Sequence, residues 1–140
     1  MSRSFEIYID GASKGNPGHS GIGIAIYLDG GLLKSVSSYI GETTNNIAEY
    51  TALIYALEEA LLLKAGNVKV NTDSQLLARQ INKIYKVRHE GLISLYERAM
   101  RLISGFENFS IEHIPREKNA LADKLATEAV KKKLKGGIVY

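Results

Sequence analysis

The order in which strand and helix patterns follow one another limits the fold of this chain more than any other feature. Strand-like alternation of apolar and polar residues occurs in five segments, at about residues 5–10, 21–28, 32–40, 68–72 and 109–115. Helix-like spacing occurs in four segments, at about residues 46–65, 74–84, 90–103 and 119–134. The first three strands therefore come before any helix, and helices separate the strands that follow.

This order predicts how the strands pair. The first three strands follow one another directly, and Asp29-Gly30-Gly31 is typical of a hairpin turn, so we expect antiparallel pairing there. The later strand–helix–strand succession favours parallel pairing through right-handed crossovers. The sequence therefore predicts an α/β fold with a mixed five-stranded sheet, three antiparallel strands and then parallel ones, and helices on both faces.

Local signals predict element boundaries. The Gly-rich segment 11–18 is predicted to be a loop, and Asn46, with Glu49 three residues later, is predicted to cap the first helix. The length of 140 residues suits a single domain, 1–140. Residues 136–140 are then a C-terminal tail that is either loose or paired with another segment.

The composition excludes several kinds of site and location. The chain has no Cys, which excludes disulfides, thiolate metal sites and cysteine nucleophiles. No apolar run approaches the roughly 18 residues of a membrane helix. Glu6 comes too early for a signal peptide, so we expect a cytoplasmic protein with no membrane partner. Residues 114–140 are basic, which suits a phosphate-bearing partner or complements a helix dipole.

Four carboxylates fall at predicted element boundaries: Asp10, Glu49, Asp73 and Asp123. Each alone has an ordinary explanation as a turn or helix-start residue. If the first and fourth strands are parallel neighbours, however, Asp10 and Asp73 share one sheet edge with the start of the first helix. Crowded carboxylates repel one another and need a cation. The group therefore predicts a site for two hard divalent ions, such as Mg²⁺, that hydrolyses phosphodiesters.

Polar residues suited to a sugar–phosphate chain are expected beside these acids. Asn16 lies in a Gly-rich loop whose backbone amides can approach a ligand. Thr44, Asn45 and Asn46 lie at a helix start, which favours phosphate binding, and Gln75 follows the fourth strand. The alternative is that these Asn residues only form turns or caps.

Four motifs, in this order, make the sequence resemble type 1 ribonuclease H, in its short archaeal-type form, over about residues 5–134. They are DGASKGNPG at 10–18, TNNIAEY at 44–50, TDSQ at 72–75, and HIPREKN at 113–119 followed by ADKLA at 122–126. The resemblance implies endonucleolytic hydrolysis of the RNA strand of RNA–DNA hybrids with two Mg²⁺ or Mn²⁺ ions, which leaves 5′-phosphate and 3′-hydroxyl ends.

The resemblance also assigns roles to residues. The metal-binding acids of the family fall on Asp10, Glu49, Asp73 and Asp123. Its substrate-binding residues fall on Asn16, Thr44, Asn45, Asn46 and Gln75. Several of these read the RNA 2′-hydroxyl, the group that separates RNA from DNA.

The sequence departs from well-studied bacterial members in the region of their basic protrusion, which is rich in Lys and Trp. Here that region is compressed to residues 82–91, and the chain has no Trp. We therefore expect substrate binding to rely on Lys83, Lys86 and Arg88 and on the basic last helix.

A second departure concerns the residue that assists catalysis. The bacterial form places a His in a flexible loop ten residues before the last acid. His113 has that spacing, but it reads as the end of a strand. Arg116 stands seven residues before Asp123, and some short archaeal-type members use an Arg there. We favour Arg116 as the catalytic residue and keep His113 as the alternative, a proton shuttle.

Other functions remain open at this point. Some archaeal-type members also cleave double-stranded RNA, which is a second candidate substrate. A non-catalytic nucleic-acid-binding module of the same fold is the alternative from another class, although such a module has no need of all four acids. We expect a monomer.

Overall fold

The computed structural model describes residues 3–136 and confirms the predicted mixed sheet. Its strands are β1 (Arg3–Gly15), β2 (Gly18–Leu28), β3 (Gly31–Thr43), β4 (Ala65–Thr72) and β5 (Asn108–His113). They lie in the order β3-β2-β1-β4-β5, antiparallel between β1, β2 and β3 and parallel between β1, β4 and β5. The helices are α1 (Asn45–Leu62), α2 (Gln75–Ile81), α3 (Glu90–Ile103) and α4 (Ala120–Gly136), with a 3₁₀ turn, η1 (Arg116–Lys118), before α4.

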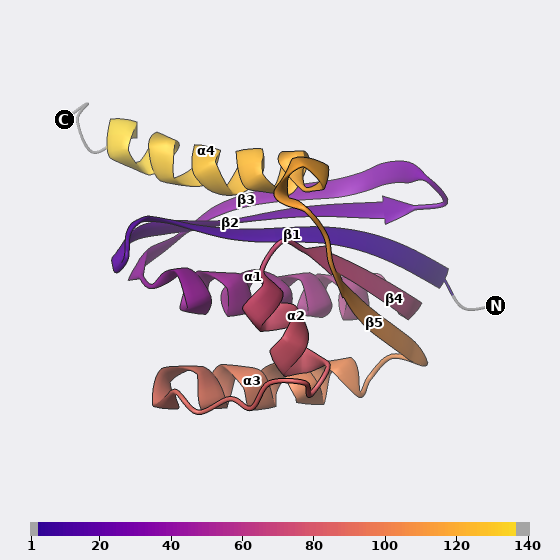
Figure 1. Ribbon diagram of the computed structural model, residues 1–140. Coiled ribbons are helices and arrows are strands. Elements are labelled where there is room, and N and C mark those ends of the chain that lie inside the picture. The colour runs from indigo at the N-terminus through magenta and orange to yellow at the C-terminus, as the bar shows by residue number, and fades with distance from the viewer. Residues whose placement is uncertain (1–2, 137–140) are drawn as a thin grey trace.

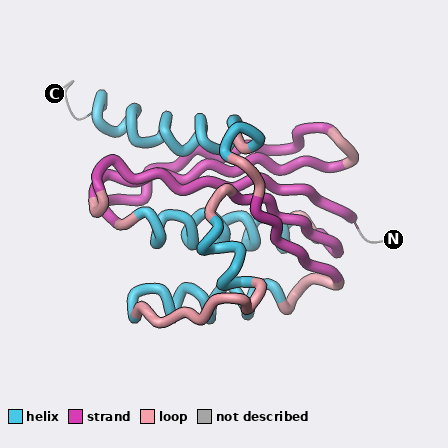
Figure 2. The backbone as a smooth tube through the Cα atoms, viewed as in Figure 1, coloured by secondary structure: helices cyan, strands magenta, loops and turns pink. Residues whose placement is uncertain are grey.

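Helices cover both faces of the sheet, as the sequence predicts (Figure 1, Figure 2). α4 packs on β1, β2 and β3 from one side. α1 packs on β1 and β2 from the other side, and α3 lies against the outer surface of α1. Phe5, Ile7 and Ile9 of β1 are buried in the core that α1 completes. Because side chains alternate along a strand, Asp10 points toward the α4 side.

Several boundaries differ from the sequence prediction, and three of them lie close to predicted site residues. Most of the segment 11–18 is strand, because β1 stays paired with β2 as far as Gly15 and Gly18. The N-cap of α1 is Thr44 and not Asn46, since Thr44 Oγ1 accepts a hydrogen bond from the Ile47 N–H. α2 ends at Ile81, before the predicted residue 84, and Lys83 adopts a left-handed backbone conformation with φ of 63°.

Two other expectations concern the end of the chain and membranes. Gly136, the first residue of the predicted tail, ends α4, and residues 137–140 lie outside the described residues. Among the helices that the structure describes, none combines the length and the apolar character that a bilayer crossing requires.

The register between β1 and β4 places two of the acids side by side. Ile9 lies opposite Thr72 in this parallel pair. The next residues, Asp10 and Asp73, therefore emerge at the same level of neighbouring strands. The predicted meeting of these two carboxylates at one sheet edge is thus a direct consequence of the pairing.

Two glycines allow the helices to approach this edge. A Cβ on Gly11 would overlap the backbone of α1 next to Glu49. A Cβ on Gly23, which pairs with Asp10, would overlap the carbonyl oxygen of Ala122 in α4. Because neither residue has a side chain, α1 and α4 lie directly on the sheet and bring their acids close to Asp10.

Candidate active site

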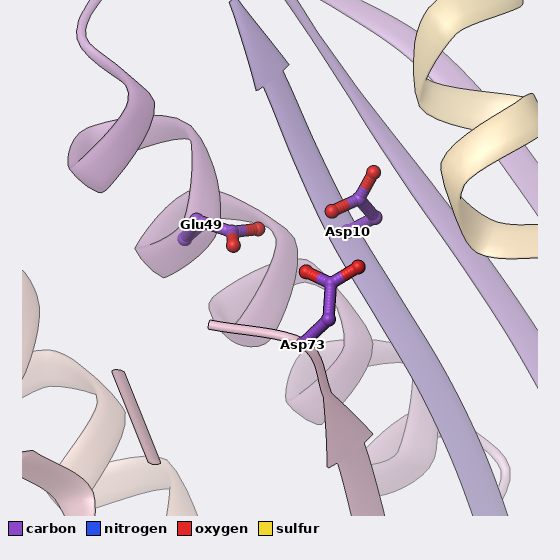
Figure 3. A group of neighbouring side chains, drawn as sticks. All are labelled: Asp10, Glu49 and Asp73. Atoms are coloured by element: carbon purple, nitrogen blue, oxygen red, sulfur yellow. The ribbon is translucent and has the colours of Figure 1, made fainter. Parts of the chain in front are cut away.

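Three carboxylates converge where the parallel pairing of β1 with β4 ends, from β1, from α1 and from the residue after β4 (Figure 3). Asp10, Glu49 and Asp73 each offer one oxygen, and these oxygens lie within 4.8 Å of one another. Asp10 is only 5% exposed and Glu49 8%, whereas Asp73 is half-buried. Carboxylates so close together in a poorly hydrated place repel one another when ionised, which is the arrangement that a bound cation stabilises.

Burial and repulsion change the protonation of both buried acids. Burial, together with the charges of Glu49, Asp73 and Asp123, raises the pKa of Asp10 to about 9. Burial likewise raises the pKa of Glu49 to about 8, although the hydrogen bond from the Gly11 N–H acts in the opposite direction. Without a cation these carboxyl groups therefore tend to hold protons. Oxygen ligands in this arrangement fit a divalent metal ion, which would displace the protons on binding.

Asp123 joins the group from the first turn of α4. Its carboxyl forms a side-chain hydrogen bond with Asp10, but it is not one of the three acids whose oxygens lie within 4.8 Å of one another. Arg116 Nη2 lies 3.5 Å from Asp123 Oδ1, and the Arg116 side chain is otherwise 77% exposed. The site thus has three tightly grouped carboxylates, a fourth beside Asp10, and a guanidinium on its open side.

The structure places the two candidates for an assisting residue differently. Arg116 contacts a site acid directly through its ion pair with Asp123. His113 ends β5 opposite Thr72, the residue before Asp73, and it is exposed. His113 is therefore one strand away from the acids, with its backbone held in the sheet. The choice of Arg116 stays a prediction, and the contact with Asp123 supports it.

Four of the five predicted substrate residues lie together at the start of α1. Asn16 Oδ1 accepts a hydrogen bond of 3.0 Å from the Asn45 N–H, which ties the turn between β1 and β2 to the helix. The Thr44 hydroxyl caps the helix, and Asn46 is exposed in its first turn. Gln75, the fifth residue, is exposed at the first position of α2.

A groove of about 380 Å³ runs beside these residues. Asn16, Thr44 and Asn46 line one wall, and Lys86, Arg88 and His89 from the segment between α2 and α3 line another. Lys86 and Arg88 are basic residues of the compressed region that the sequence predicts to bind substrate, whereas nothing in the sequence pattern indicates His89. The compressed segment therefore lines this groove with the basic side chains of Lys86 and Arg88.

The sequence reasoning missed two residues that touch the acids. Gly11 donates its backbone N–H to Glu49 Oε1. Asn119 is 1% exposed, and its Nδ2 lies 3.5 Å from Asp73 Oδ2. Both belong to motifs quoted above, but neither carries a charge, and only the folded structure brings them to the carboxylates.

Comparisons with known proteins agree with this geometry. A family model described as "Reverse transcriptase-like" matches residues 8–129. Ribonuclease HI of Halobacterium salinarum is 41% identical over 124 residues, which are 88% of this chain and 62% of that protein. The crystal structure of RNase H1 from the same archaeon matches with a TM-score of 0.90 at 39% identity, and covers 92% of this chain and 98% of that one.

A second solved structure adds a nucleic acid. The crystal structure of LC11-RNase H1 in complex with an RNA/DNA hybrid matches with a TM-score of 0.89 at 42% identity. The match covers 94% of this chain and 99% of that chain. The chain spans 62% of the length of the Halobacterium protein and 35% of the length of the mycobacterial relatives.

Proposed function

Since the chain belongs to the ribonuclease H family, we propose that it is a metal-dependent endonuclease that hydrolyses the RNA strand of RNA–DNA hybrids. The observation that carries this proposal is the group of carboxylates beside the last paired residues of β1 and β4, completed by Asp123. The relative solved with an RNA/DNA hybrid supports the choice of substrate. The expected products carry 5′-phosphate and 3′-hydroxyl ends.

Asp10, Glu49, Asp73 and Asp123 would hold two Mg²⁺ or Mn²⁺ ions, since both ions prefer oxygen ligands. When bound, such ions activate water and stabilise the leaving oxygen of a phosphodiester. The protein contributes the positions of the ligands. Gly11 holds one oxygen of Glu49, and the pairing of β1 with β4 fixes the backbone before Asp10 and Asp73.

The exposed polar residues at the start of α1 suit a ribose–phosphate chain. Their hydroxyl and amide groups both donate and accept hydrogen bonds, as recognition of an RNA 2′-hydroxyl requires. The N-terminus of α1 adds backbone N–H groups that favour phosphate. We assign substrate contacts to Asn16, Thr44, Asn45, Asn46 and Gln75. Lys86 and Arg88 add positive charge across the groove.

Arg116 is assigned to stabilising negative charge on the reacting phosphate. A guanidinium remains protonated at any working pH, so it cannot accept a proton but can bind a phosphate oxygen. Its contact with Asp123 keeps it beside the acids while most of the side chain stays open to solvent. The alternative, in which His113 moves a proton, predicts a different dependence of rate on pH.

The test is a cleavage assay on three labelled duplexes of one sequence: an RNA–DNA hybrid, a double-stranded RNA and a DNA duplex. Each is incubated with Mg²⁺, with Mn²⁺ or with EDTA. We expect metal-dependent cleavage of the hybrid and none of DNA, and the double-stranded RNA decides whether that substrate is also used. Binding of the hybrid without cleavage in either metal would instead identify a non-catalytic nucleic-acid-binding module.

A further inference from the structure

Asn119 occupies an unusual place for a polar residue. It follows η1 and directly precedes α4, yet it is only 1% exposed and ranks among the most deeply buried side chains of the described residues. In Figure 1 the chain crosses here from β5 to the other side of the sheet, where α4 begins beside β1. The residue therefore lies where the elements that carry the acids meet.

The side chain of Asn119 turns toward the strands. Its Nδ2 donates a hydrogen bond of 2.8 Å to the backbone oxygen of Ile9, the residue before Asp10. The same nitrogen lies 3.5 Å from Asp73 Oδ2. The opposite orientation of the amide would place Oδ1 against the Ile9 carbonyl oxygen, and two acceptors repel. The donor end of the amide thus faces β1 and Asp73.

The ordinary role of an Asn before a helix does not explain this arrangement. A capping Asn accepts a hydrogen bond from a free backbone N–H of the first turn. Asn119 Oδ1 accepts none, and it is the one buried side-chain oxygen or nitrogen of the described residues without a hydrogen-bond partner. An unsatisfied buried acceptor is unfavourable. The side chain therefore does not cap α4, and its amide nitrogen instead contacts Ile9 and Asp73.

The backbone of Asn119 extends these contacts to the rest of the site. Its carbonyl oxygen accepts the Asp123 N–H at 3.0 Å, which starts α4. Its own N–H donates to the Arg116 carbonyl oxygen at 2.9 Å. One buried residue is thus bonded to the segments that carry Asp10, Asp73, Asp123 and Arg116.

We propose that Asn119 is a positioning residue of the metal site. Its side-chain amide ties Ile9 of β1 and Asp73 after β4 to the start of α4, and so fixes Asp73 and Asp123 relative to Asp10. A hydrogen bond donated to a carboxylate restricts its rotation and leaves its other lone pairs for a metal ion. This role rests on the proposed nuclease function and adds a residue that neither binds metal nor touches the substrate.

The test measures Mn²⁺ affinity by calorimetric titration of nucleic-acid-free protein, together with kcat and KM on the hybrid. Two variants remove the amide: Asn119→Ala, and Asn119→Ser, which keeps a hydroxyl of a kind well tolerated at helix starts. Asn71→Ala is the matched control, because Asn71 is also buried but donates to Glu6, away from the acids. Loss of a residue that orients metal ligands lowers metal affinity or activity by about 10–100-fold.

The proposal predicts that both Asn119 variants bind Mn²⁺ more weakly by about that factor and lose kcat, while KM stays within about twofold. Asn71→Ala should lose stability but keep the Mn²⁺ affinity and kcat of the wild type. Should Asn119→Ser fold and retain wild-type Mn²⁺ affinity and kcat, Asn119 would have only a structural role, and the proposal is wrong. Wild-type protein that neither binds Mn²⁺ nor cleaves the hybrid would instead refute the proposed function itself.

Discussion

Replacing Asp10 by Asn should stabilise the metal-free protein, and the gain should grow with pH. In the folded protein the pKa of Asp10 is raised to about 9 from its ordinary value of 3.8, chiefly by burial and then by the neighbouring acids. Between these two values the folded state holds a proton that the unfolded chain has released. The free energy of unfolding of the wild type therefore falls as pH rises through this window.

The size of the effect follows from linkage. One proton held only by the folded state lowers the free energy of unfolding by about 1.4 kcal/mol for each pH unit. Asp10→Asn removes that proton, so its advantage over the wild type should widen by about 3 kcal/mol over two pH units, for example from about pH 5.5 to 7.5. For a chain of this length that corresponds to roughly 10 °C in melting temperature.

The assay is urea or thermal unfolding in EDTA at several pH values. Asp29→Asn is the matched control, since Asp29 lies in the exposed turn between β2 and β3, and its profile should run parallel to that of the wild type. Excess Mg²⁺ should reduce or reverse the difference in the free energy of unfolding between Asp10→Asn and the wild type, because the ion binds the ionised Asp10 carboxylate, which the variant lacks. Parallel pH profiles for the wild type and Asp10→Asn would refute the electrostatic description of the site.

Three further predictions concern the surroundings of the acids. Arg116→Ala should lower kcat by about 10²-fold and His113→Ala by less. A larger loss of kcat in His113→Ala would exchange the two roles. The double variant Lys86→Ala/Arg88→Ala should raise KM more than it lowers kcat, and it should reduce the log–log slope of hybrid binding against salt by about one unit per lost phosphate contact. Both effects should be larger than those of Lys131→Ala/Lys132→Ala. An unchanged KM would show that the groove does not bind the hybrid. Gly11→Ala should lower the free energy of unfolding by about 1–3 kcal/mol, because its Cβ would overlap the backbone of α1. Gly31→Ala should change it little in the same unfolding assay, because its Cβ would meet only the Leu28 carbonyl oxygen, at an ordinary contact distance of 3.8 Å.

Much of the site could be predicted from the sequence because it depends on topology. The sequence places Asp10 and Asp73 just after two predicted strands. Although β1 in fact continues to Gly15, its parallel pairing with β4 ends at Ile9 and Thr72, and that register is enough to bring the two acids together. The helix that follows β3 begins at the same edge of the sheet, so Glu49, Asn45 and Asn46 in its first turns lie there too. These inferences require the order of elements but no atomic detail.

The rest depends on close approaches that no local pattern encodes. Glu49 looks like part of a capping box, but Thr44 caps the helix, and Glu49 instead accepts the N–H of a glycine 38 residues away. Asn119 looks like a helix cap, and only the folded structure turns its amide to Ile9 and Asp73. Similarly, the Gly-rich composition of residues 11–18 predicts a loop. The structure differs because most of this segment pairs with β2, a long-range contact that local composition does not encode.

The rate of hybrid cleavage as a function of Mg²⁺ concentration, measured for the wild type and for Asp10→Asn at one pH near 8, tests most directly whether these carboxylates hold catalytic metal ions. We expect no cleavage by the wild type in EDTA, a rate that rises with Mg²⁺, cuts confined to the RNA strand, and loss of turnover in Asp10→Asn while the variant remains folded. Wild-type cleavage in EDTA, or Asp10→Asn cleaving at the wild-type rate, would contradict the claim that these carboxylates hold the metal ions that hydrolyse RNA.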